Sequence, residues 1–342
     1  MDIRRFPIAA GMALSLLLGA GSVAASPVLL GQTIYTGATG AEVDINPTGQ
    51  LVYIASGFGQ TGWVRIDASN PGAMTQSTLA GGWGGGVAVD PVTGRYASTS
   101  GYGGAFRIFN ADGSIRSTSP LSGCGGSVAY GGGRFAVSTQ CSDHIAIFDE
   151  VSGAMLANIA SNGVGSSTVY NSATNTFYQN RTPSFSPGGT NALAIGPTFS
   201  TSNVAGFVYD ANGVTNRLYV NNGGGTQVLD GSTNAVLATV AYSGEVEADT
   251  LLNRYYIGSG SGINILDGLT NTLIDSILLP FGQSFQTMGM EDGSNLLYVI
   301  TSGGGASHLL VYSTTSEVPE PASIAMMLVG LLAIGGLRVR QR

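Results

Sequence analysis

The sequence predicts an all-β protein built from a tandem repeat, because composition, turn chemistry and periodicity agree. Of 342 residues 53 are Gly and only 10% are charged, which is typical of a turn-rich β protein rather than a helical one. A strand–turn–strand unit occurs seven times, and the residues that mark its turn are 37 to 45 positions apart. The marking residues are Gly49, Gly94, Gly133, Asn175, Asn216, Asn253 and Ser294.

Each unit consists of two short strands around a tight reversal, as in VAVDPVTGRYAST and VEADTLLNRYYIG. A third apolar stretch follows, such as WVRID or INILD, and most units show a fourth, such as AVLATVA. Four short strands per roughly 40 residues is the spacing of a β-propeller blade. We therefore predict a seven-bladed β-propeller with four-stranded antiparallel blades over residues 26–316.

The last unit lacks a fourth strand of its own, because LLVYSTTSEVPEP runs directly into the C-terminal tail. The segment Leu29–Gly37, LLGQTIYTG, has the pattern of a fourth strand followed by Gly. We expect this N-terminal strand to complete the last blade, closing the ring and removing its open edges.

The unit V-A-V-D-P-x-T-G-R, followed by an apolar triplet ending in Asp, resembles the YVTN-type propeller repeats of secreted bacterial proteins. The likeness to WD-repeat proteins is weaker, because Gly-His and Trp-Asp pairs do not occur. Propellers of the resembling kind serve as surface-layer proteins, binding modules and lactonase-like enzymes, so the resemblance implies a fold and does not choose a function.

The N-terminus predicts export. MDIRRFPIAAGMALSLLLGAGSVAAS has Arg4 and Arg5, an apolar core over about Ile8–Leu18 and small residues before Ala25. This is the pattern of a helical secretory signal peptide over residues 1–25, cut after Ala25.

The C-terminus predicts a second, membrane-spanning helix. Ala322–Leu337 is apolar or small throughout and reaches ~24 Å as a helix, against a hydrocarbon core of ~30 Å. Arg338, Arg340 and Arg342 should stay on the cytoplasmic side, which leaves the body of the protein outside. The alternative to a processed tail is an ordinary anchor that is never cleaved.

The order of Pro319, Glu320 and Pro321, a short apolar helix and the Arg cluster resembles the PEP-CTERM sorting signal, over residues 317–342. The resemblance implies that an exosortase in the inner membrane of a Gram-negative bacterium removes the tail. The protein would then be anchored in the inner membrane only transiently and pass to the cell surface or the extracellular matrix. Bacteria with this system usually also make exopolysaccharide.

Charge narrows the choice of partners. All thirteen basic residues of the chain are Arg, and residues 26–320 carry 8 of them against 19 Asp and Glu, a net charge of −11. An acidic surface of this kind argues against nucleic acid or anionic lipid as a partner.

Candidate metal ligands are four carboxylates on two units. Glu245 and Glu247 alternate along one strand, as do Glu42 and Asp44 at the matching positions of the first unit. Innermost strands line the channel of a propeller, so these groups could converge on a divalent cation; the alternative is a solvated channel mouth. No cofactor is otherwise expected.

The chain's two cysteines, Cys124 and Cys141, flank the hairpin SVAYGGGRFAVS. Their numbers have the same sum as those of Tyr130 and Phe135 beside the turn, so the predicted register places the cysteines opposite each other. In an oxidising compartment this predicts a disulfide.

A candidate ligand patch consists of aromatic residues on Gly-flanked loops: Phe58, Trp63, Trp83, Tyr102 and His144. Flat rings on exposed loops suit stacking on sugar faces. The alternative is that the rings fold back over the loops as local packing.

Two functions remain open on the sequence. The first is a monomeric, non-catalytic envelope or matrix propeller that binds polysaccharide or another surface protein, with no catalytic residues assigned. It is favoured by the tail and by the chain's poverty of catalytic motifs, with only His144 and His308 as histidines. The alternative is a secreted, metal-dependent propeller enzyme of the lactonase type.

Overall fold

The protein is all-β in the part that the structure describes. The computed structural model describes residues 26–56, 62–78, 84–100, 104–139, 144–160, 168–179, 207–221, 224–290 and 294–315. These residues form 26 strands and one short 3₁₀ turn, Pro47–Gly49. The predicted signal peptide over residues 1–25 and the predicted sorting tail over residues 317–342 lie outside the described residues.

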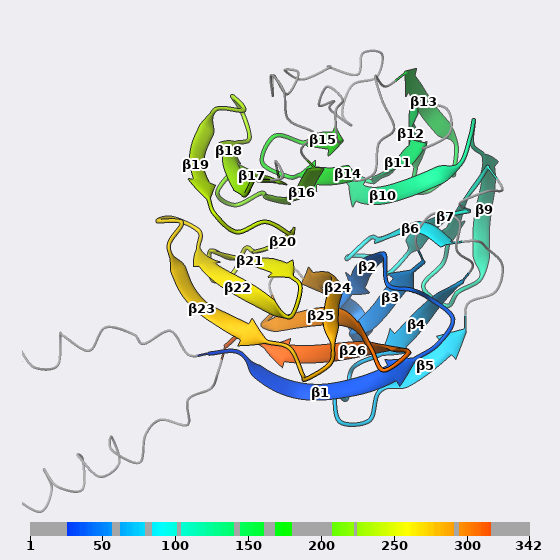
Figure 1. The fold of residues 1–342 in the computed structure, drawn as a ribbon. Helices are drawn as coiled ribbons and strands as arrows, with labels where there is room; N and C mark the ends of the chain where they lie inside the picture. Colours follow the sequence, from blue (N-terminus) through cyan, green and yellow to red (C-terminus); the bar gives the residue numbers. More distant parts are fainter. Residues whose placement is uncertain are drawn as a thin grey trace, which may run out of the picture. The chain divides into compact units, whose positions relative to one another are not determined.

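The strands follow the predicted repeat through the first half of the chain (Figure 1). Three successive four-stranded sheets have the order β2-β3-β4-β5, β6-β7-β8-β9 and β10-β11-β12-β13. Their strands are β2 (Glu42–Asn46), β3 (Leu51–Ala55), β4 (Trp63–Asp67), β5 (Thr75–Thr78), β6 (Gly84–Val89), β7 (Tyr96–Ser100), β8 (Ala105–Phe109), β9 (Ile115–Pro120), β10 (Gly125–Gly131), β11 (Arg134–Thr139), β12 (His144–Asp149) and β13 (Met155–Ala160).

The second half holds one two-stranded sheet, β14-β15, and three more four-stranded sheets, β16-β17-β18-β19, β20-β21-β22-β23 and β1-β26-β25-β24. Their strands are β14 (Thr168–Asn171), β15 (Thr176–Gln179), β16 (Phe207–Asn212), β17 (Arg217–Asn221), β18 (Thr226–Asp230), β19 (Val236–Val240), β20 (Glu245–Asp249), β21 (Arg254–Ser259), β22 (Gly262–Asp267), β23 (Leu273–Leu278), β24 (Ser284–Met290), β25 (Leu296–Gly303), β26 (Ala306–Ser313) and β1 (Val28–Tyr35).

The innermost strands close a ring, which confirms the β-propeller prediction (Figure 1). Going round the ring, each of these strands contacts the next, and the last contacts the first: β2, β6, β10, β14, β16, β20 and β24.

The prediction of seven complete blades is not met in the described residues. They contain six four-stranded blades, and the fourth unit contributes only the pair β14–β15 to its sheet. The chain between this pair and β16, residues 180–206, lies outside the described residues. Among described residues, no helix is long and apolar enough to cross a membrane.

The N-terminal strand completes the last blade, as predicted. β1 pairs antiparallel with β26, from Val28 opposite Ser313 to Tyr35 opposite Ser307. The last four-stranded sheet therefore joins the two ends of the repeat region, and its outer edge is formed by a strand from the opposite end of the sequence.

The turn residues behave largely as their chemistry predicts. Five of the seven marking residues have positive φ, namely Gly94, Gly133, Asn175, Asn216 and Asn253. In the first unit the left-handed residue is Gln50, one position after the predicted Gly49, because a 3₁₀ turn precedes it. Gly and Asn tolerate this backbone region better than other residues, which is why they mark the repeat.

A buried Asx residue is the last residue of four of the innermost strands and directly follows a fifth, β6. Its side-chain oxygen accepts a hydrogen bond from the N–H two positions later, as Asn46 does from Thr48 at 3.0 Å and Asp249 from Leu251 at 3.0 Å. This satisfies a turn N–H that would otherwise be unpaired, and it fixes the direction in which the hairpin leaves the ring. The five residues are Asn46, Asp90, Asn171, Asn212 and Asp249.

The core lies between neighbouring sheets. At least one fully buried aromatic residue on the second strand of each sheet, β14–β15 included, packs against an adjacent sheet or within its own. Tyr53 and Tyr96 have ring centroids 4.4 Å apart, and Tyr219 and Tyr255 have theirs 4.7 Å apart. Such ring pairs stabilise by roughly 0.5–1.5 kcal/mol beyond the area they bury. The set is Tyr53, Tyr96, Phe135, Phe177, Tyr219, Tyr255 and Tyr298.

Ring closure gives a first prediction. Gly31 lies at the register shift of β1, and a Cβ there would overlap the carbonyl of Pro71, in the loop between β4 and β5 of the neighbouring blade. We expect Gly31→Ala to lower the free energy of unfolding by about 1–3 kcal/mol, measured by urea denaturation. Gly72→Ala is the control, because its Cβ would meet only Asn70 at an ordinary 3.6 Å. Equal stability of the two variants would contradict this role of Gly31.

Candidate functional site: the acidic central channel

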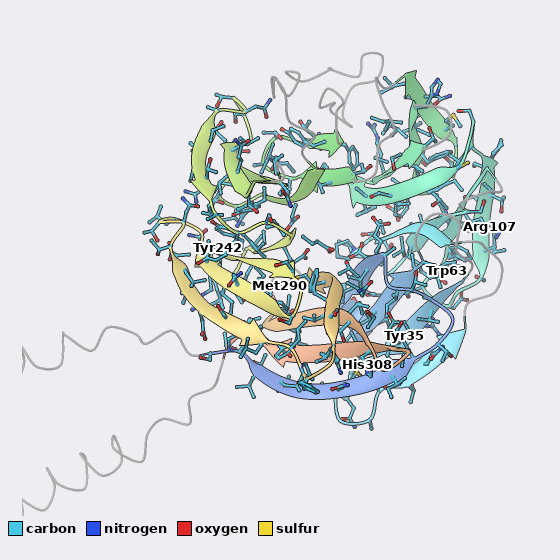
Figure 2. All side chains as sticks on the ribbon, viewed as in Figure 1. Tyr35, Trp63, Arg107, Tyr242, Met290 and His308 are labelled. Carbon is cyan, nitrogen blue, oxygen red and sulfur yellow. The ribbon has the colours of Figure 1, made fainter. Side chains whose placement is uncertain are left out.

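The ring of innermost strands encloses a cavity of about 910 Å³. Residues from every innermost strand line it, from Glu42 on β2 to Met290 on β24 (Figure 2). No Arg is among the described lining residues. Five of them are acidic, namely Glu42, Asp44, Asp210, Glu245 and Glu247. The described wall of the channel is therefore negatively charged or, where a carboxyl is protonated, neutral.

The first blade's carboxylates bind the backbone of the second blade. The Val87 N–H donates to Glu42 Oε2 at 3.1 Å, and the Val89 N–H donates to Asp44 Oδ2 at 2.8 Å. Both bonds join β2 to β6, and both cross one blade boundary in the same register. The two innermost strands therefore run side by side in the same direction.

Glu42 also reaches a third blade. The Ser127 hydroxyl on β10 donates to Glu42 Oε1 at 2.7 Å, while the Thr168 N–H on β14 donates to Ser127 Oγ at 3.1 Å. This chain of bonds links the blades from the first to the fourth, and it ties β14 into the ring although its sheet has only two described strands.

The same arrangement recurs on the other side of the channel. The Met288 and Met290 N–H groups donate to Glu245 and Glu247 at 3.2 and 2.8 Å, which joins β20 to β24. The Thr287 hydroxyl adds a bond to Glu245 at 2.5 Å. Asp210 accepts from the Ala248 N–H at 2.6 Å and joins β16 to β20.

The reason for this pattern is the free edge of each innermost strand. One side of the strand pairs with its own blade, and the other faces the channel, where N–H groups have no strand partner. A backbone N–H that is removed from water needs an acceptor. A carboxylate on the preceding blade supplies one, so the acidic residues act as clasps between blades.

Burial shifts the titration of these clasps. Desolvation raises the pKa of Glu42 from 4.5 to about 8, against the opposing effect of the Ser127 hydroxyl and the Val87 N–H. Desolvation likewise raises the pKa of Glu245 to about 7, and it raises that of Glu247 well above 4.5, with the charge of Asp210 adding to the shift. Burial thus shifts Glu42, Glu245 and Glu247 toward the protonated form, compared with exposed carboxyl groups.

The four predicted metal ligands line one cavity, as the repeat implied. Each of them, however, accepts a hydrogen bond from a backbone N–H of a neighbouring innermost strand. Glu42 and Asp44 bind β6, while Glu245 and Glu247 bind β24. Among the described residues, no group of three or more His, Cys, Asp or Glu is placed to hold a metal ion. These residues therefore do not fit a ready-made cation site, and we derive no chemistry from one.

Sequence reasoning missed Asp210. Its position is two residues before Asn212, as Asp44 is two before Asn46 and Glu247 is two before Asp249. Aligning the repeats on this buried Asn or Asp, instead of on the turn glycine, would therefore have identified Asp210 as a channel carboxylate. A register shift between Val208 and Asp210 obscured the alternation along β16.

A second buried cluster joins the second and third blades beside the turns. The Arg95 guanidinium and the Glu150 carboxylate form an ion pair at 2.7 Å, and the Tyr130 hydroxyl donates to Glu150 at 3.1 Å. Asp90 adjoins this cluster. Burial by itself would raise the pKa of Asp90, but hydrogen bonds from the Thr93 hydroxyl and the Val92 N–H hold that pKa below its ordinary value. In the third blade Gly131 takes the place of the strand-ending Asx residue, and Glu150 supplies a carboxylate nearby.

The predicted aromatic ligand patch is wrong for Trp63. Trp63 is the first residue of β4 and is only 2% exposed, because its ring packs edge-on against Tyr96 and Phe109 at 5.8 and 5.2 Å (Figure 2). His144 begins β12, where its N–H donates to Thr139 Oγ1 at 2.9 Å and closes the β11–β12 hairpin. The other members, Phe58, Trp83 and Tyr102, lie outside the described residues.

The cysteine prediction is met in part. Cys124 is disulfide-bonded, and Cys141, the chain's other cysteine, lies outside the described residues. The predicted register holds from Tyr130–Phe135 to Val128–Val137, but Gly125 pairs with Thr139 after a shift. An irregularity in β10 that the sequence did not reveal therefore separates Cys124 from the turn.

Fold and channel together define a β-propeller whose blades are clasped by carboxylates. A comparison with solved structures agrees with the propeller fold. The solved WD40 β-propeller domain of Doa1 superimposes with a TM-score of 0.65, over 85% of this chain and 98% of that chain, at 14% identity. That identity supports the fold alone.

The chain also carries a sorting signal. Residues 317–342 match the family model of the PEP-CTERM protein-sorting motif, which includes Pro319, Glu320, Pro321, Arg338, Arg340 and Arg342. The motif implies export and processing by an exosortase, with sorting to the cell surface. No curated protein matches the chain.

The burial of Trp63 gives a second prediction. We expect Trp63→Ala to lower the free energy of unfolding by about 3–5 kcal/mol, because the substitution leaves a cavity between the first two blades. Thermal and urea denaturation measure the loss. Phe281→Ala is the control, since Phe281 is fully exposed and should leave stability nearly unchanged. A Trp63→Ala variant as stable as the control would contradict the packing role of Trp63.

The clasps give a third prediction, on pH. Because the pKa of Glu42 is about 8 in the folded protein and near 4.5 when unfolded, the folded state holds more protons between these values. Stability should therefore fall as the pH rises from ~4.5 to ~8. Glu42→Gln, which cannot titrate, should flatten this slope in urea denaturation. Asp275→Asn on β23 removes one carboxylate outside the cavity and controls for net charge. An unchanged slope in Glu42→Gln would refute the assignment.

Proposed function

We propose that this chain is an exported envelope protein of a Gram-negative bacterium, a non-catalytic propeller that associates with exopolysaccharide or another surface protein. A signal peptide over residues 1–25 directs export, and exosortase removes the tail. The body over residues 26–316 is a β-propeller whose described residues form six four-stranded blades and the pair β14–β15. The observation that carries the proposal is the PEP-CTERM motif at residues 317–342, directly after the propeller.

The channel supports a non-catalytic role. Propeller enzymes of the lactonase type would use channel carboxylates on a divalent metal, with the metal activating water. Here the carboxylates of Glu42, Glu245 and Glu247 accept backbone N–H groups of the next blade. Using them as metal ligands would leave those N–H groups without acceptors, at a cost of roughly 1–3 kcal/mol each.

Charge supports a matrix partner rather than nucleic acid. The net charge of −11 over residues 26–320 repels polyanions. A neutral polysaccharide, or a protein with a basic surface, has no such penalty.

Processing gives the fourth prediction. In cells that carry an exosortase, the mature extracellular protein should lack Ala322–Arg342, as measured by mass spectrometry of the C-terminal peptide. Changing Pro319, Glu320 and Pro321 together to alanine should leave full-length protein in the inner-membrane fraction. Val318→Ala is the control and should be processed normally. Mature extracellular protein that retains Arg342 would refute exosortase processing.

The same cells test the association. Deletion of exopolysaccharide synthesis should release the processed protein into the medium, whereas the parent strain retains it. Retention that does not depend on the polysaccharide would point to a surface-protein partner. A stoichiometric divalent metal in the purified protein, lost on Glu42→Gln, would contradict the non-catalytic reading and favour the lactonase-type enzyme.

A further inference from the structure

The hairpin turns between first and second strands all lie on one face of the propeller, as do the turns between third and fourth strands. Neighbouring innermost strands run in the same direction, as the matching registers of the clasps show for β2 with β6 and for β20 with β24. In several blades the residue after the third strand also bonds to this first turn. Gly231 N–H donates to Asn216 O, and Gly268 N–H to Asn253 O, both at 2.8 Å. We call this side the turn face.

The propeller's C-terminal end lies on the turn face. Thr314 follows the third strand of the last blade, and its N–H donates to the carbonyl of Asn295 at 2.7 Å, the equivalent bond in that blade. The N-terminal end is beside it, because Val28 pairs with Ser313. The chain therefore enters and leaves the propeller at this face.

The turn face carries exposed apolar side chains at the tips of its turns. Val92 and Val214 occupy inner-hairpin turns of the second and fifth blades and are 86% and 75% exposed. Val214 also lines the mouth of the central cavity. The set comprises Val92, Val151, Val214, Leu251 and Leu269. Exposed apolar side chains on several turns of one face favour contact of that face with an apolar partner surface.

The length of chain that follows decides what this contact is. Only residues 316–321 separate Thr315 from the apolar span Ala322–Leu337 of the sorting tail. Seven residue steps reach at most about 25 Å. While the tail is in the membrane, Thr315, at the edge of the turn face, can thus be no farther than that distance from the start of the apolar span.

We propose that the turn face docks on the bilayer surface through Val92, Val214, Leu251 and Leu269 until the tail is removed. This rests on the proposed sorting function and adds an orientation to it, with the turn face toward lipid and the opposite loops toward the outside. Shallow insertion of apolar tips contributes about 25 cal/mol for each Å² of apolar surface removed from water.

Charge sets the lipid preference. Asp149, Asp230 and Asp267 lie in the third-to-fourth-strand turns of this face, where hydrogen bonds from Ser or Thr hydroxyls and backbone N–H groups hold their pKa below the ordinary value. They are ionised at neutral pH and repelled by anionic headgroups. Docking should therefore be stronger on zwitterionic lipid than on anionic lipid.

The test uses the full chain, with its native disulfide oxidised, in phosphatidylcholine vesicles that contain doxyl-labelled lipid. A single additional cysteine carries an environment-sensitive dye in place of Val92, Val214 or Phe281. Phe281 is the matched control, because it is fully exposed but lies beside the loops of the opposite face, near Gly260 and Gly303. A fourth label at Leu328 reports insertion of the tail.

We expect dyes at Val92 and Val214 to shift to the blue and to be quenched several-fold more than the dye at Phe281. Replacing phosphatidylcholine by phosphatidylglycerol should reduce that difference. With the dye moved to Leu251, the pair Val92→Ser and Val214→Ser should lower quenching. Ile115→Ser with Val236→Ser, on outer strands β9 and β19, should leave it unchanged.

The outcomes separate docking from sorting. Quenching at Leu328 with none at Val92 or Val214, or with equal quenching at Phe281, overturns docking and leaves the anchored tail intact. No quenching at Leu328 contradicts the anchoring step of the proposed function and docking with it. A signal at Val92 that disappears when protein is diluted at constant lipid would assign the face to a second copy of this chain, and would also overturn lipid docking.

Discussion

The fold depends on how the innermost strands satisfy the N–H groups that face the channel. A closed ring of sheets leaves each innermost strand with one edge unpaired, and unpaired N–H groups away from water are costly. Glu42, Asp44, Asp210, Glu245 and Glu247 provide acceptors across three of the blade boundaries in the described residues, from β2 to β6, from β16 to β20 and from β20 to β24. The acidity of the channel is therefore a consequence of ring construction, and it need not indicate catalysis.

Two kinds of contact hold neighbouring blades together, and they act at different radii. Near the axis the carboxylate clasps are directional and fix the register between blades. Further out, buried rings such as Tyr53 against Tyr96 pack with aliphatic side chains in the space between sheets. The same outer layer buries Trp63, so an aromatic residue beside a Gly-rich loop is structural here.

Ring closure also determines how the propeller meets its surroundings. Because β1 pairs with β26, both ends of the repeat region lie on the face that carries the inner turns. The sorting motif follows within a few residues, so topology and targeting are coupled. A propeller closed without the N-terminal strand would leave β26 as an open edge and would place its two ends differently.

The sequence by itself determined the repeat, the closing strand and the sorting motif. Each depends on local patterns, such as Gly94 and Asn216 at positive φ or the order of Pro319, Glu320 and Pro321. Only the tertiary structure decided what the carboxylates bind, that Trp63 is buried, and that β10 and β16 shift register. These features arise between blades about 40 residues apart or from single-residue irregularities, and strand periodicity encodes neither.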